Sequence, residues 1–324
     1  MPKKILRIAI TTGDPDGIGT EITAKALSKI GPCAGVFFYV WRSPKTPRSH
    51  LTMIDRRFKR ITVSSWPEAL SAPISSAKQI VDICSNLPAP IWVETSAQSS
   101  YFGHIDGMVT APLSKTAIIA AGMKDIGHTA ILARVCKEKN LYQAFVGEKF
   151  HVLLLSAHLA IGDVLKEIKT ENLERAINAA EQLRRWLPKK SQRRPLAILG
   201  LNPHAGEEGL IGSEEQNIHI PLIKKLSASG MNIVGPLVPD AAFFKENWQK
   251  YSVYVANYHD QGLIPFKMIH GQDSGLHITM GLPFVRTSVD HGTAKNIFGR
   301  NKANPASMKL ALEWALHLAR GESK

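Results

Sequence analysis

The sequence predicts an α/β protein with a largely parallel sheet, organised as two lobes. Short β-rich apolar runs recur along the chain, and segments long enough for a helix separate several of them, which is the alternation that parallel sheets require. The 324 residues also exceed the roughly 100 to 200 residues of one typical domain. We therefore expect two packed lobes with the functional site in the cleft between them.

The first predicted elements form a strand, a turn and a helix. Residues 5–11 are a β-rich apolar run, residues 13–17 (GDPDG) favour a turn, and residues 20–30 have the spacing of an amphipathic helix. Further strands are predicted at 36–40, 108–110, 144–146, 152–155, 196–201 and 251–256. Further helices are predicted at 171–187, 214–229 and 307–319. Residues 41–100, rich in Ser, Pro and Arg, show no clear pattern.

Composition narrows the class of protein. A hydrophobic content of 44% with 21% charged residues is ordinary for a globular chain. No stretch approaches the ~20 apolar residues needed to cross a bilayer, and the N-terminal apolar run lacks a cleavage site for secretion. Cys33, Cys84 and Cys136 are widely spaced and form no CxxC pair, which argues against disulfides and thiolate metal sites. We expect a cytoplasmic protein.

The formal net charge of +13 raises the question of a nucleic-acid partner. The densest basic run lies at residues 184–194, but no recognition-helix motif or aromatic-interleaved platform accompanies it. The run is typical of a solvated helix end and loop. Nucleic acid is thus not expected as a partner, whereas the positive field would attract an anionic substrate.

Three histidines follow three of the predicted strands. His158 lies in LSAHL, His204 in NPHAGE and His259 in NYHDQG. Each of them taken alone is also compatible with an ordinary hydrogen-bonded loop residue. Together they favour a site, because ligands of open α/β sheets bind beyond the carboxyl ends of the strands. Imidazoles suit Zn²⁺ or Co²⁺ better than Mg²⁺, so we expect one divalent metal, with zinc favoured and cobalt or magnesium left open.

Carboxylates near these histidines are candidate catalytic groups. Asp260 follows His259 directly, and Asp240 precedes the same strand. Either could orient a metal ligand or move protons, and either could instead cap a loop.

Longer phrases around these residues resemble the 4-hydroxythreonine-4-phosphate dehydrogenase family of the vitamin B6 pathway. The phrases are TTGDPDGIGTEI (11–22), VTAPLSK (109–115), GHTAIL (127–132), LNPHAGEEGLIGSEE (201–215), NYHDQGLIPFK (257–267) and GLPFVRTSVDHGTA (281–294). They cover nearly the whole chain apart from residues 41–100.

The resemblance implies a fold and an assembly. The fold is a two-lobed α/β/α unit related to isocitrate and isopropylmalate dehydrogenases, with the active site in the interdomain cleft. One lobe would comprise residues 1–120 with 297–324, and residues 121–296 would form the lobe that carries the metal ligands and most substrate contacts. The protein would act as a homodimer whose metal ligands come from both subunits.

The resemblance also assigns residues. His158, His204 and His259 fall on the family's metal ligands, and the substrate contacts fall on His128, Thr129, Lys267, His277 and Arg286. Lys and Arg suit a phosphate or carboxylate, because each charge-assisted hydrogen bond contributes about 1.5 to 3 kcal/mol. A surface salt bridge is the alternative role for these two cations. Lys115, in APLSK, is a further catalytic candidate.

The segment DHGTAKNIFGRNKANP (290–305) resembles the adenosine-binding loop of isocitrate and isopropylmalate dehydrogenases. By that resemblance NAD or NADP would contact His291, Gly292, Thr293, Ala294 and Asn304. Small residues let backbone approach a ligand closely, and an Asn amide offers both a donor and an acceptor to adenine. A structural turn before the last helix is the alternative. The GDPDGIG turn is not a GxGxxG fingerprint, so no dinucleotide site is expected there.

The implied reaction oxidises the hydroxyl of 4-phosphohydroxy-L-threonine. The metal would act as a Lewis acid on the hydroxyl, hydride would pass to NAD or NADP, and decarboxylation would yield 3-amino-2-oxopropyl phosphate and CO₂. A small phosphorylated hydroxy acid is thus the expected substrate.

Several positions depart from the family pattern. His277 stands where Asn is typical, Ala130 stands where a carboxylate is typical, and Thr12 and Asp16 replace commoner residues of the first loop. Asn304-Pro305 is closer to the isocitrate dehydrogenase version. A dehydrogenase for phosphothreonate, phosphoerythronate or a cyclic dihydrodiol therefore remains an alternative. A non-catalytic, basic nucleic-acid-binding protein is a further alternative, which the intact histidine set with Lys267 and Arg286 disfavours.

Overall fold

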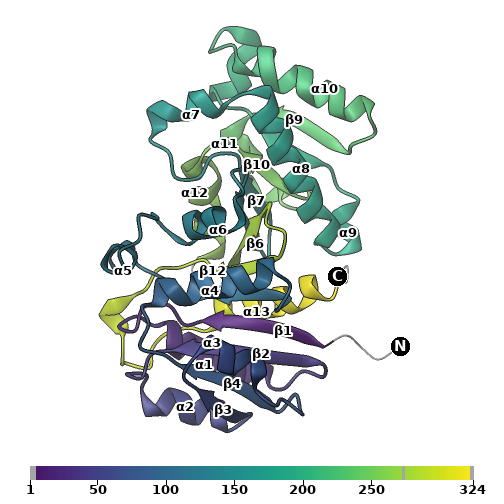
Figure 1. Ribbon diagram of the computed structural model, residues 1–324. Helices are drawn as coiled ribbons and strands as arrows, with labels where there is room; N and C mark the ends of the chain where they lie inside the picture. The colour runs from purple at the N-terminus through teal and green to yellow at the C-terminus, as the bar shows by residue number, and fades with distance from the viewer. Residues whose placement is uncertain (1–4, 272–273, 322–324) are drawn as a thin grey trace. The chain divides into compact units, whose positions relative to one another are not determined.

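The computed structural model describes residues 5–271 and 274–321, and the chain divides into two compact units. Unit 1 comprises the described residues 5–141 and 282–321, and unit 2 comprises the described residues 142–271 and 274–281. Each unit contains its own α/β layers (Figure 1). The two-lobed α/β prediction is confirmed at this level.

The elements of unit 1 alternate strand and helix from the start. Its strands are β1 (Leu6–Thr11), β2 (Val36–Arg42), β3 (Lys59–Val63), β4 (Gln79–Cys84), β5 (Gly107–Thr110) and β12 (Val285–Val289). Its helices are α1 (Gly19–Ile30), α2 (Arg48–Asp55), α3 (Trp66–Ser71), α4 (Ala89–Tyr101), α5 (Lys115–Ala120), α6 (His128–Cys136) and α13 (Ala306–Ala319), with a 3-10 turn η4 (Lys295–Ile297).

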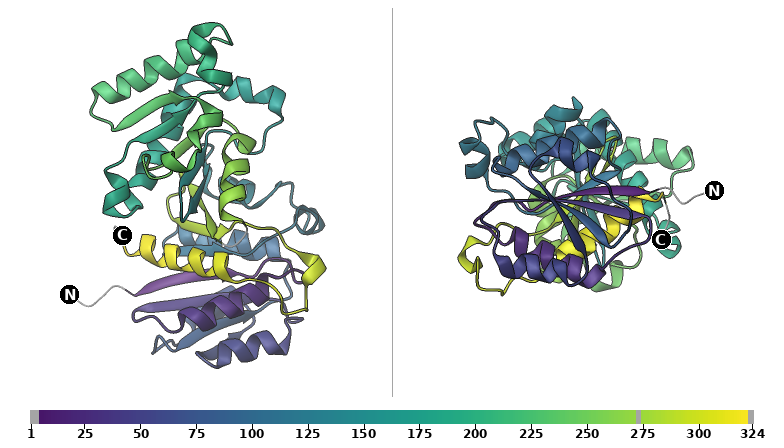
Figure 2. Two further views of the ribbon diagram at one scale, coloured as in Figure 1. Left: turned by 180° about the vertical axis from the view of Figure 1, so that it is seen from behind. Right: turned by 60° about the horizontal axis from the view of Figure 1, so that its bottom comes forward.

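The sheet of unit 1 has the strand order β3-β4-β2-β1-β5-β12, and neighbouring strands run parallel. Successive side chains of a strand point to opposite faces, so helices cover both. Helices α3 to α6 pack on one face, and α1 contacts α2 and α13 on the other (Figure 2). The carboxyl ends of β1, β5 and β12 therefore lie side by side at one edge.

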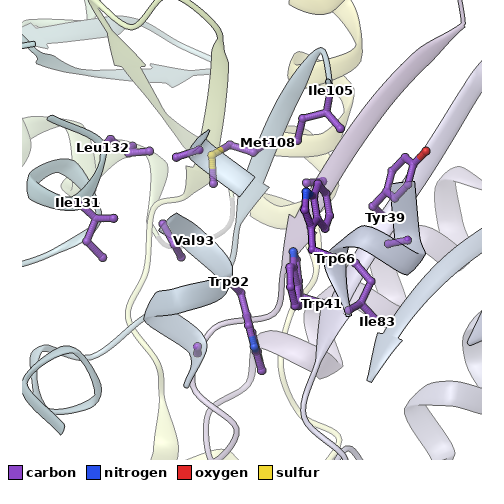
Figure 3. Packing of buried hydrophobic residues seen from close by; sticks show 14 of the residues in the cluster. Tyr39, Trp41, Trp66, Ile83, Trp92, Val93, Ile105, Met108, Ile131 and Leu132 are labelled. Carbon is purple, nitrogen blue, oxygen red and sulfur yellow. The ribbon is translucent and has the colours of Figure 1, made fainter. Parts of the chain in front are cut away.

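The core of unit 1 is built around stacked indoles. The Trp41 and Trp66 rings lie 5.4 Å apart at 11°, and the Trp41 and Trp92 rings lie 6.1 Å apart at 10° (Figure 3). Trp41 donates its indole N–H to Ser96 and Trp66 donates its own to Ser99, which satisfies two polar groups inside an apolar cluster. These three residues come from the segment 41–100, whose elements were not readable in sequence.

Unit 2 has two antiparallel pairings within an otherwise parallel sheet. Its strands are β6 (Tyr142–Gly147), β7 (His151–Leu154), β8 (Leu196–Leu199), β9 (Ile233–Leu237), β10 (Tyr254–Ala256) and β11 (Gly275–Met280). Its helices are α7 (Ile161–Glu167), α8 (Thr170–Trp186), α9 (Lys189–Gln192), α10 (Ile220–Ala228), α11 (Pro239–Ala242) and α12 (His259–His270). Three further turns are η1 (Pro203–Gly209), the π-turn η2 (Glu215–His219) and η3 (Lys245–Asn247).

The strand order in unit 2 is β11-β6-β7-β10-β8-β9, with β6 antiparallel to both of its neighbours. The strands β7, β10, β8 and β9 are parallel, so their carboxyl ends share one edge. Helix α12 packs on β7 and β10 over an aromatic core that includes Phe145, Phe150 and Phe266, and α8 packs on the sheet as well.

The boundary between the units differs from the one expected from the sequence. Residues 121–141 and 282–296 belong to unit 1, not to the second lobe. The reason is packing, because Ile131 and Leu132 of α6 enter the core of unit 1 and β12 pairs with β5. Among the predicted substrate residues, His128, Thr129 and Arg286 therefore lie in unit 1, and only Lys267 and His277 lie in unit 2.

Two other expectations can be compared with the structure. Cys33, Cys84 and Cys136 are free thiols. In the basic run, Arg184 is buried and donates to the carbonyls of Arg194 and Asn232, so part of this charge serves the fold. Within the described ranges, no helix has both the length and the apolar character of a membrane span.

Candidate active site

The three histidines singled out in the sequence follow neighbouring strands of unit 2. Strand β10 pairs in parallel with β7 on one side and with β8 on the other. His158 follows β7, His204 follows β8, and His259 is the first residue of α12 after β10. The topology thus directs all three segments to the same edge of the sheet, which is where α/β proteins bind ligands.

Two of the three imidazoles lie close together. The ring centres of His158 and His259 are 5.8 Å apart, and both rings line a cavity of about 310 Å³. The side-chain amide nitrogen of Gln143 lies 3.5 Å from Nδ1 of His158. Oδ1 of Asp260 lies 2.7 Å from Nδ1 of His259, and Asp260 also lines the cavity.

His204 lies in a stretch of left-handed backbone. His204, Ala205, Gly206, Glu207 and Glu208 have φ values of 52°, 51°, 81°, 42° and 58°. Each L residue in this region costs roughly 1–2 kcal/mol, and strain of this kind concentrates at functional sites. His204 is largely exposed, with Oε2 of Glu207 2.9 Å from its Nδ1.

The donor set fits a divalent cation of the zinc type. A carboxylate lies at hydrogen-bond distance from Nδ1 of His204 and of His259. The lone pair on Nε2 of each ring is therefore the one available to a metal. With metal–nitrogen distances of about 2.1 Å, two imidazoles that share one ion have ring centres roughly 5 Å apart, close to the spacing of His158 and His259. In the described part of this single chain, no three His, Cys, Asp or Glu side chains form a metal-binding group. The three-histidine set therefore stays a prediction.

The other catalytic candidates occupy different surroundings. Asp260 is exposed except for its contact with His259. Asp240 is exposed on α11, which packs against η1, the segment that carries His204. Lys115 is exposed at the first residue of α5 in unit 1. The structure therefore brings only Asp260 into contact with one of the predicted metal ligands.

Lys267 and His277 are the substrate candidates of unit 2. Lys267 is exposed on α12, two turns after Asp260, on the same side of that helix. His277 is buried on β11, where its ring stacks on Phe145 with centres 5.1 Å apart at 23°. Stacking on Phe145 therefore holds the ring of His277, in addition to any hydrogen bond.

Arg286 and His128 form a second cluster, in unit 1. Arg286 is 1% exposed on β12, and its Nη2 donates to Oγ1 of Thr110 at 2.6 Å. Burial lowers the pKa of Arg286 to about 9, so the guanidinium stays charged at neutral pH. Burial also lowers the pKa of His128 to about 3, and the positive charge of Arg286 adds to this shift. Thr129 is half-buried beside His128 in the first turn of α6.

A buried cation next to an uncharged imidazole is suited to hold an anionic group. The guanidinium supplies the positive charge, and the neutral imidazole can add one N–H donor. Nε2 of His128 is a buried nitrogen without a hydrogen-bond partner among residues 5–271 and 274–321. The cluster could therefore accept a phosphate or carboxylate oxygen at both groups.

The predicted cofactor loop is fixed to the first turn of unit 1. The amide of Ile18 donates to the carbonyl of Thr293 at 3.0 Å, and a Cβ at Gly17 would approach that same oxygen to 3.1 Å. Lys295 pairs with Asp16 at 2.8 Å and with Asp14 at 3.4 Å. The N-terminal turn therefore positions the loop, although it lacks a dinucleotide fingerprint of its own.

Individual residues of this loop differ in what they offer a ligand. Gly292 is exposed with open space where a side chain would lie, and Ala294 adopts a left-handed φ of 43°. Nδ1 of His291 lies 3.0 Å from the carbonyl of Gly292. Oδ1 of Asn304 already accepts from the amide of Ala306 at the start of α13, at 3.0 Å. That bond uses one of the two lone pairs of the oxygen, so the Asn304 amide could still offer its nitrogen and the second lone pair to a ligand.

Sequence reasoning missed several side chains that surround the histidines. Gln143 contacts His158 across the antiparallel β6–β7 pair, and Glu207 contacts its neighbour His204. Glu215, 1% exposed, accepts from the amides of Leu201 at 2.7 Å and Asn202 at 2.8 Å. Burial raises the pKa of Glu215, but hydrogen bonds from Asn202 and Leu201 outweigh it and lower the pKa overall. Only Glu207, three residues after His204, was detectable by spacing.

The class of protein follows first from the fold. The isocitrate dehydrogenase of Methylococcus capsulatus superimposes with a TM-score of 0.51 at 12% identity, covering 98% of this chain and 88% of that one. A likeness at this identity concerns the fold alone. It confirms the predicted isocitrate-dehydrogenase-like α/β class.

The family is shown by closer relatives. Residues 87–315 match the family model for pyridoxal phosphate biosynthetic protein PdxA. The 4-hydroxythreonine-4-phosphate dehydrogenase of Sulfurihydrogenibium sp. is 34% identical over 98% of this chain and 99% of that protein. The D-threonate 4-phosphate dehydrogenase of Salmonella typhimurium is 35% identical over 96% and 98%. The crystal structure of 4-hydroxythreonine-4-phosphate dehydrogenase from Klebsiella pneumoniae superimposes with a TM-score of 0.76 at 30% identity, covering 98% and 99%.

The chain therefore belongs to the PdxA family. The resemblance found in the sequence is confirmed, and so is the prediction of an oxidoreductase of the 4-hydroxythreonine-4-phosphate dehydrogenase type.

Proposed function

We propose that this chain oxidises 4-phosphohydroxy-L-threonine with NAD or NADP and a divalent cation, and that decarboxylation yields 3-amino-2-oxopropyl phosphate for vitamin B6 biosynthesis. The observation that carries the proposal is the pair of imidazoles, His158 and His259, that line one cavity with ring centres 5.8 Å apart. The 4-hydroxythreonine-4-phosphate dehydrogenases that this chain resembles over their whole length support the substrate class.

The proposed roles follow from the groups that each residue exposes. His158, His204 and His259 would hold the cation through Nε2, and Asp260 would keep the Nδ1 proton of His259 in place. When bound, the cation stabilises negative charge on the substrate oxygen and the nicotinamide accepts hydride. Lys267 and Arg286 would bind the phosphate and carboxylate of the substrate.

The remaining predicted residues complete the proposal. His128, Thr129 and His277 would contact the substrate, and Asp240 and Lys115 would exchange protons with it. The loop 290–305 would receive the adenosine end of the dinucleotide at His291, Gly292, Thr293, Ala294 and the side-chain amide of Asn304. The open space at Gly292 supports this assignment.

We further propose a homodimer that completes the site. Large apolar side chains stay exposed after each predicted metal ligand and could pack against a second copy. Ile161 is 71% exposed after His158, Leu210 is 85% exposed after His204, and Met268 is 78% exposed on the helix that begins at His259. A second copy that covers these side chains would also bring its own histidines to this edge of unit 2.

A phosphorylated sugar acid is the second candidate substrate. The D-threonate 4-phosphate dehydrogenase of Salmonella typhimurium is as similar to this chain as the relatives named for the amino acid. His277 and Ala130 are positions where this chain departs from the amino-acid-oxidising pattern. Threonate 4-phosphate differs from 4-phosphohydroxy-threonine in carrying a hydroxyl where the latter carries an ammonium group, so a changed residue on the substrate wall could alter the preference.

A reduction screen tests both proposals. Metal-stripped protein is restored with Zn²⁺, Co²⁺ or Mg²⁺, and the formation of NADH or NADPH is followed with 4-phosphohydroxy-L-threonine, threonate 4-phosphate and erythronate 4-phosphate. We expect metal-dependent turnover of the amino acid. Turnover of the sugar acids alone would replace the substrate while the dehydrogenase assignment stands. Absence of metal-dependent turnover with all three substrates would overturn the proposed function.

A further inference from the structure

One buried asparagine joins the strand ends that carry the histidines. Asn257 is 2% exposed at the end of β10. Its Nδ2 donates to the carbonyl of Leu199 at the end of β8, at 3.0 Å. Its backbone carbonyl accepts from Oγ of Ser156, beyond the end of β7, at 2.7 Å, and from the amide of Ser156 at 3.2 Å. Asn257 thus connects the three parallel strands β7, β10 and β8 at their carboxyl ends.

The π-turn η2 holds this junction from outside the sheet. His219 is 0% exposed, and its Nε2 lies 2.9 Å from Oδ1 of Asn257. Glu215, at the other end of the same turn, accepts from the amides of Leu201 and Asn202 and from Nδ2 of Asn202 at 2.9 Å. This one turn therefore hydrogen-bonds to both the segment that follows β8 and the segment that follows β10. π-turns of this length are rare and occur often at functional sites.

The orientation of the Asn257 amide is determined by its neighbours. Its Nδ2 faces two acceptors, the carbonyl of Leu199 and Oε1 of Gln261 at 3.3 Å. Gln261 is itself oriented, because its Nε2 donates to the carbonyl of Gly200 at 2.7 Å. Oδ1 of Asn257 must therefore accept, and His219 must donate through an Nε2 proton.

The bonds of this network end two residues before each predicted metal ligand. Ser156 precedes His158 by two positions, Asn202 precedes His204, and Asn257 precedes His259. A buried polar network is costly when it is incomplete, and a complete one fixes a single arrangement of the backbone. The spacing of the three ligand segments is consequently set by side chains that would not touch the cation.

We propose that His219 and Glu215 are positioning residues that, through Asn257 and Asn202, set the spacing of the three imidazoles for a divalent cation. This inference rests on the proposed cation site. His219 bonds to the side chain of Asn257, and Glu215 bonds to Leu201 and Asn202, so both act on the histidine segments through residues that precede the predicted ligands. Loss of such supporting bonds typically weakens metal binding by 10- to 100-fold.

The test replaces His219 by residues that keep or remove its donor. In H219Q the amide nitrogen can take the place of Nε2 and donate to Asn257, whereas H219L removes the donor at similar volume. Apparent affinity for Co²⁺ is measured on the full-length protein from visible absorption against a competing chelator. We expect H219L to bind Co²⁺ about 10- to 100-fold more weakly, and H219Q to stay within about threefold of wild type. Rescue by Gln is a result that loss of packing alone would not give.

A matched control and a second readout separate positioning from general damage. His270 is also buried in unit 2, at the far end of α12, where its Nε2 accepts from the amide of Lys149. H270L should lower stability without changing Co²⁺ affinity. In metal-free protein, amide hydrogen exchange of residues 156–159 and 200–206 should be faster in H219L than in H270L. Nδ1 of His219 lies 3.3 Å from the carbonyl of Glu214, and the shorter amide of H219N can reach this carbonyl but not Asn257. H219N therefore replaces H219L if that variant does not fold, with the same weakening expected.

The outcomes distinguish this inference from the proposed function. Wild-type protein that binds no Co²⁺ would overturn the cation site and the inference with it. Wild-type protein that binds Co²⁺ while H219L or H219N binds it equally tightly would overturn the inference alone. Equal weakening in H219L and H270L would also overturn it, because the effect would then be one of stability.

Discussion

The two units treat the carboxyl ends of their parallel strands in different ways. In unit 1 the loops pack backbone against backbone, as where a Cβ at Gly13 would lie 2.0 Å from the carbonyl oxygen of Pro112. In unit 2 the loops are held apart by buried side chains, with Asn257 and Glu215 at the centre. Close backbone packing suits a loop that receives a dinucleotide, and rigid side-chain spacing suits a cation.

This contrast shows that one fold type can hold the carboxyl ends of its strands in two different ways. In unit 1 two loops approach closely at glycines, which have no side chain. The sensitive feature there is the second hydrogen atom on Cα, which any other residue replaces by a Cβ. In unit 2 polar side chains join the strand ends in addition to backbone bonds, and there the sensitive feature is one side-chain donor or acceptor. Substitutions at this edge should therefore act through steric clashes in unit 1 and through lost hydrogen bonds in unit 2.

The largest effect is expected from removing an imidazole in unit 2. H259A deletes a proposed ligand, and activity should fall at least about 100-fold, because even supporting residues of metal sites contribute 10- to 100-fold. NADH formation with saturating metal measures the effect. H104A, at an exposed histidine of unit 1, is the matched control and should retain full activity. Activity of H259A close to wild type would contradict the role of His259.

In unit 1, replacing a closely packed glycine should lower the free energy of unfolding. G13A places a Cβ against the carbonyl of Pro112 at a φ of 68°, so both a clash and left-handed strain of roughly 1–2 kcal/mol arise. G122A shares the left-handed φ, at 76°, but meets open space, and should cost only about 1 kcal/mol. Urea unfolding measures both variants. Equal destabilisation would mean that the loop contact at Gly13 is not tight.

Acid should weaken unit 2 through a buried histidine. Burial lowers the pKa of His151 to about 3, with the charges of His270 and Arg194 adding to the shift. Between pH 6.5 and 3 the unfolded chain binds a proton that the folded chain does not, so stability is full above pH 6.5 and is lost as pH falls. The slope from this group is at most about 1.4 kcal/mol per pH unit.

Urea midpoints measured across this pH range test the assignment. H151L should show a shallower loss of stability than wild type, while H104Q, an exposed control, should follow wild type. An unchanged pH slope in H151L would show that other groups govern the acid response.

The smallest effect is expected at the ion pair that holds the cofactor loop. Lys295 is 44% exposed and its partner Asp16 is 63% exposed, so K295A should change the free energy of unfolding by less than about 1 kcal/mol. The difference from wild type should shrink further in 1 M salt. A loss above 2 kcal/mol would show that the nearby buried Asp14 depends on this lysine.

The sequence was informative where one local pattern decides the structure. The apolar runs at 5–11, 36–40 and 152–155 correspond to β1, β2 and β7, and helix α13 was expected within one residue at its start. The placement of the histidines after strands was readable for the same reason. Parallel topology then follows from the alternation of elements.

Long-range features were not readable. The left-handed backbone at His204 and Ala205 has no signature in those residue types, and the segment before it is held by Glu215, which lies eleven residues after His204 and accepts from the amide of Leu201. The strand expected at 251–256 is shorter in the structure. Strand β10 begins at Tyr254, and Tyr251 and Ser252 belong to the preceding loop. The unit boundary depends on the return of residues 282–321 to the first sheet, which no local pattern encodes.

The indole stack of unit 1 has a practical consequence for following this molecule. Aromatic chromophores stacked with nearly parallel rings, as Trp41, Trp66 and Trp92 are, couple their electronic transitions and give an intense near-ultraviolet circular dichroism signal. The indole stack belongs to unit 1, whereas Trp248 of unit 2 packs against Phe150 with ring centres 5.9 Å apart at 40°. The protein thus carries a built-in optical marker that tells whether its two halves melt together or in sequence.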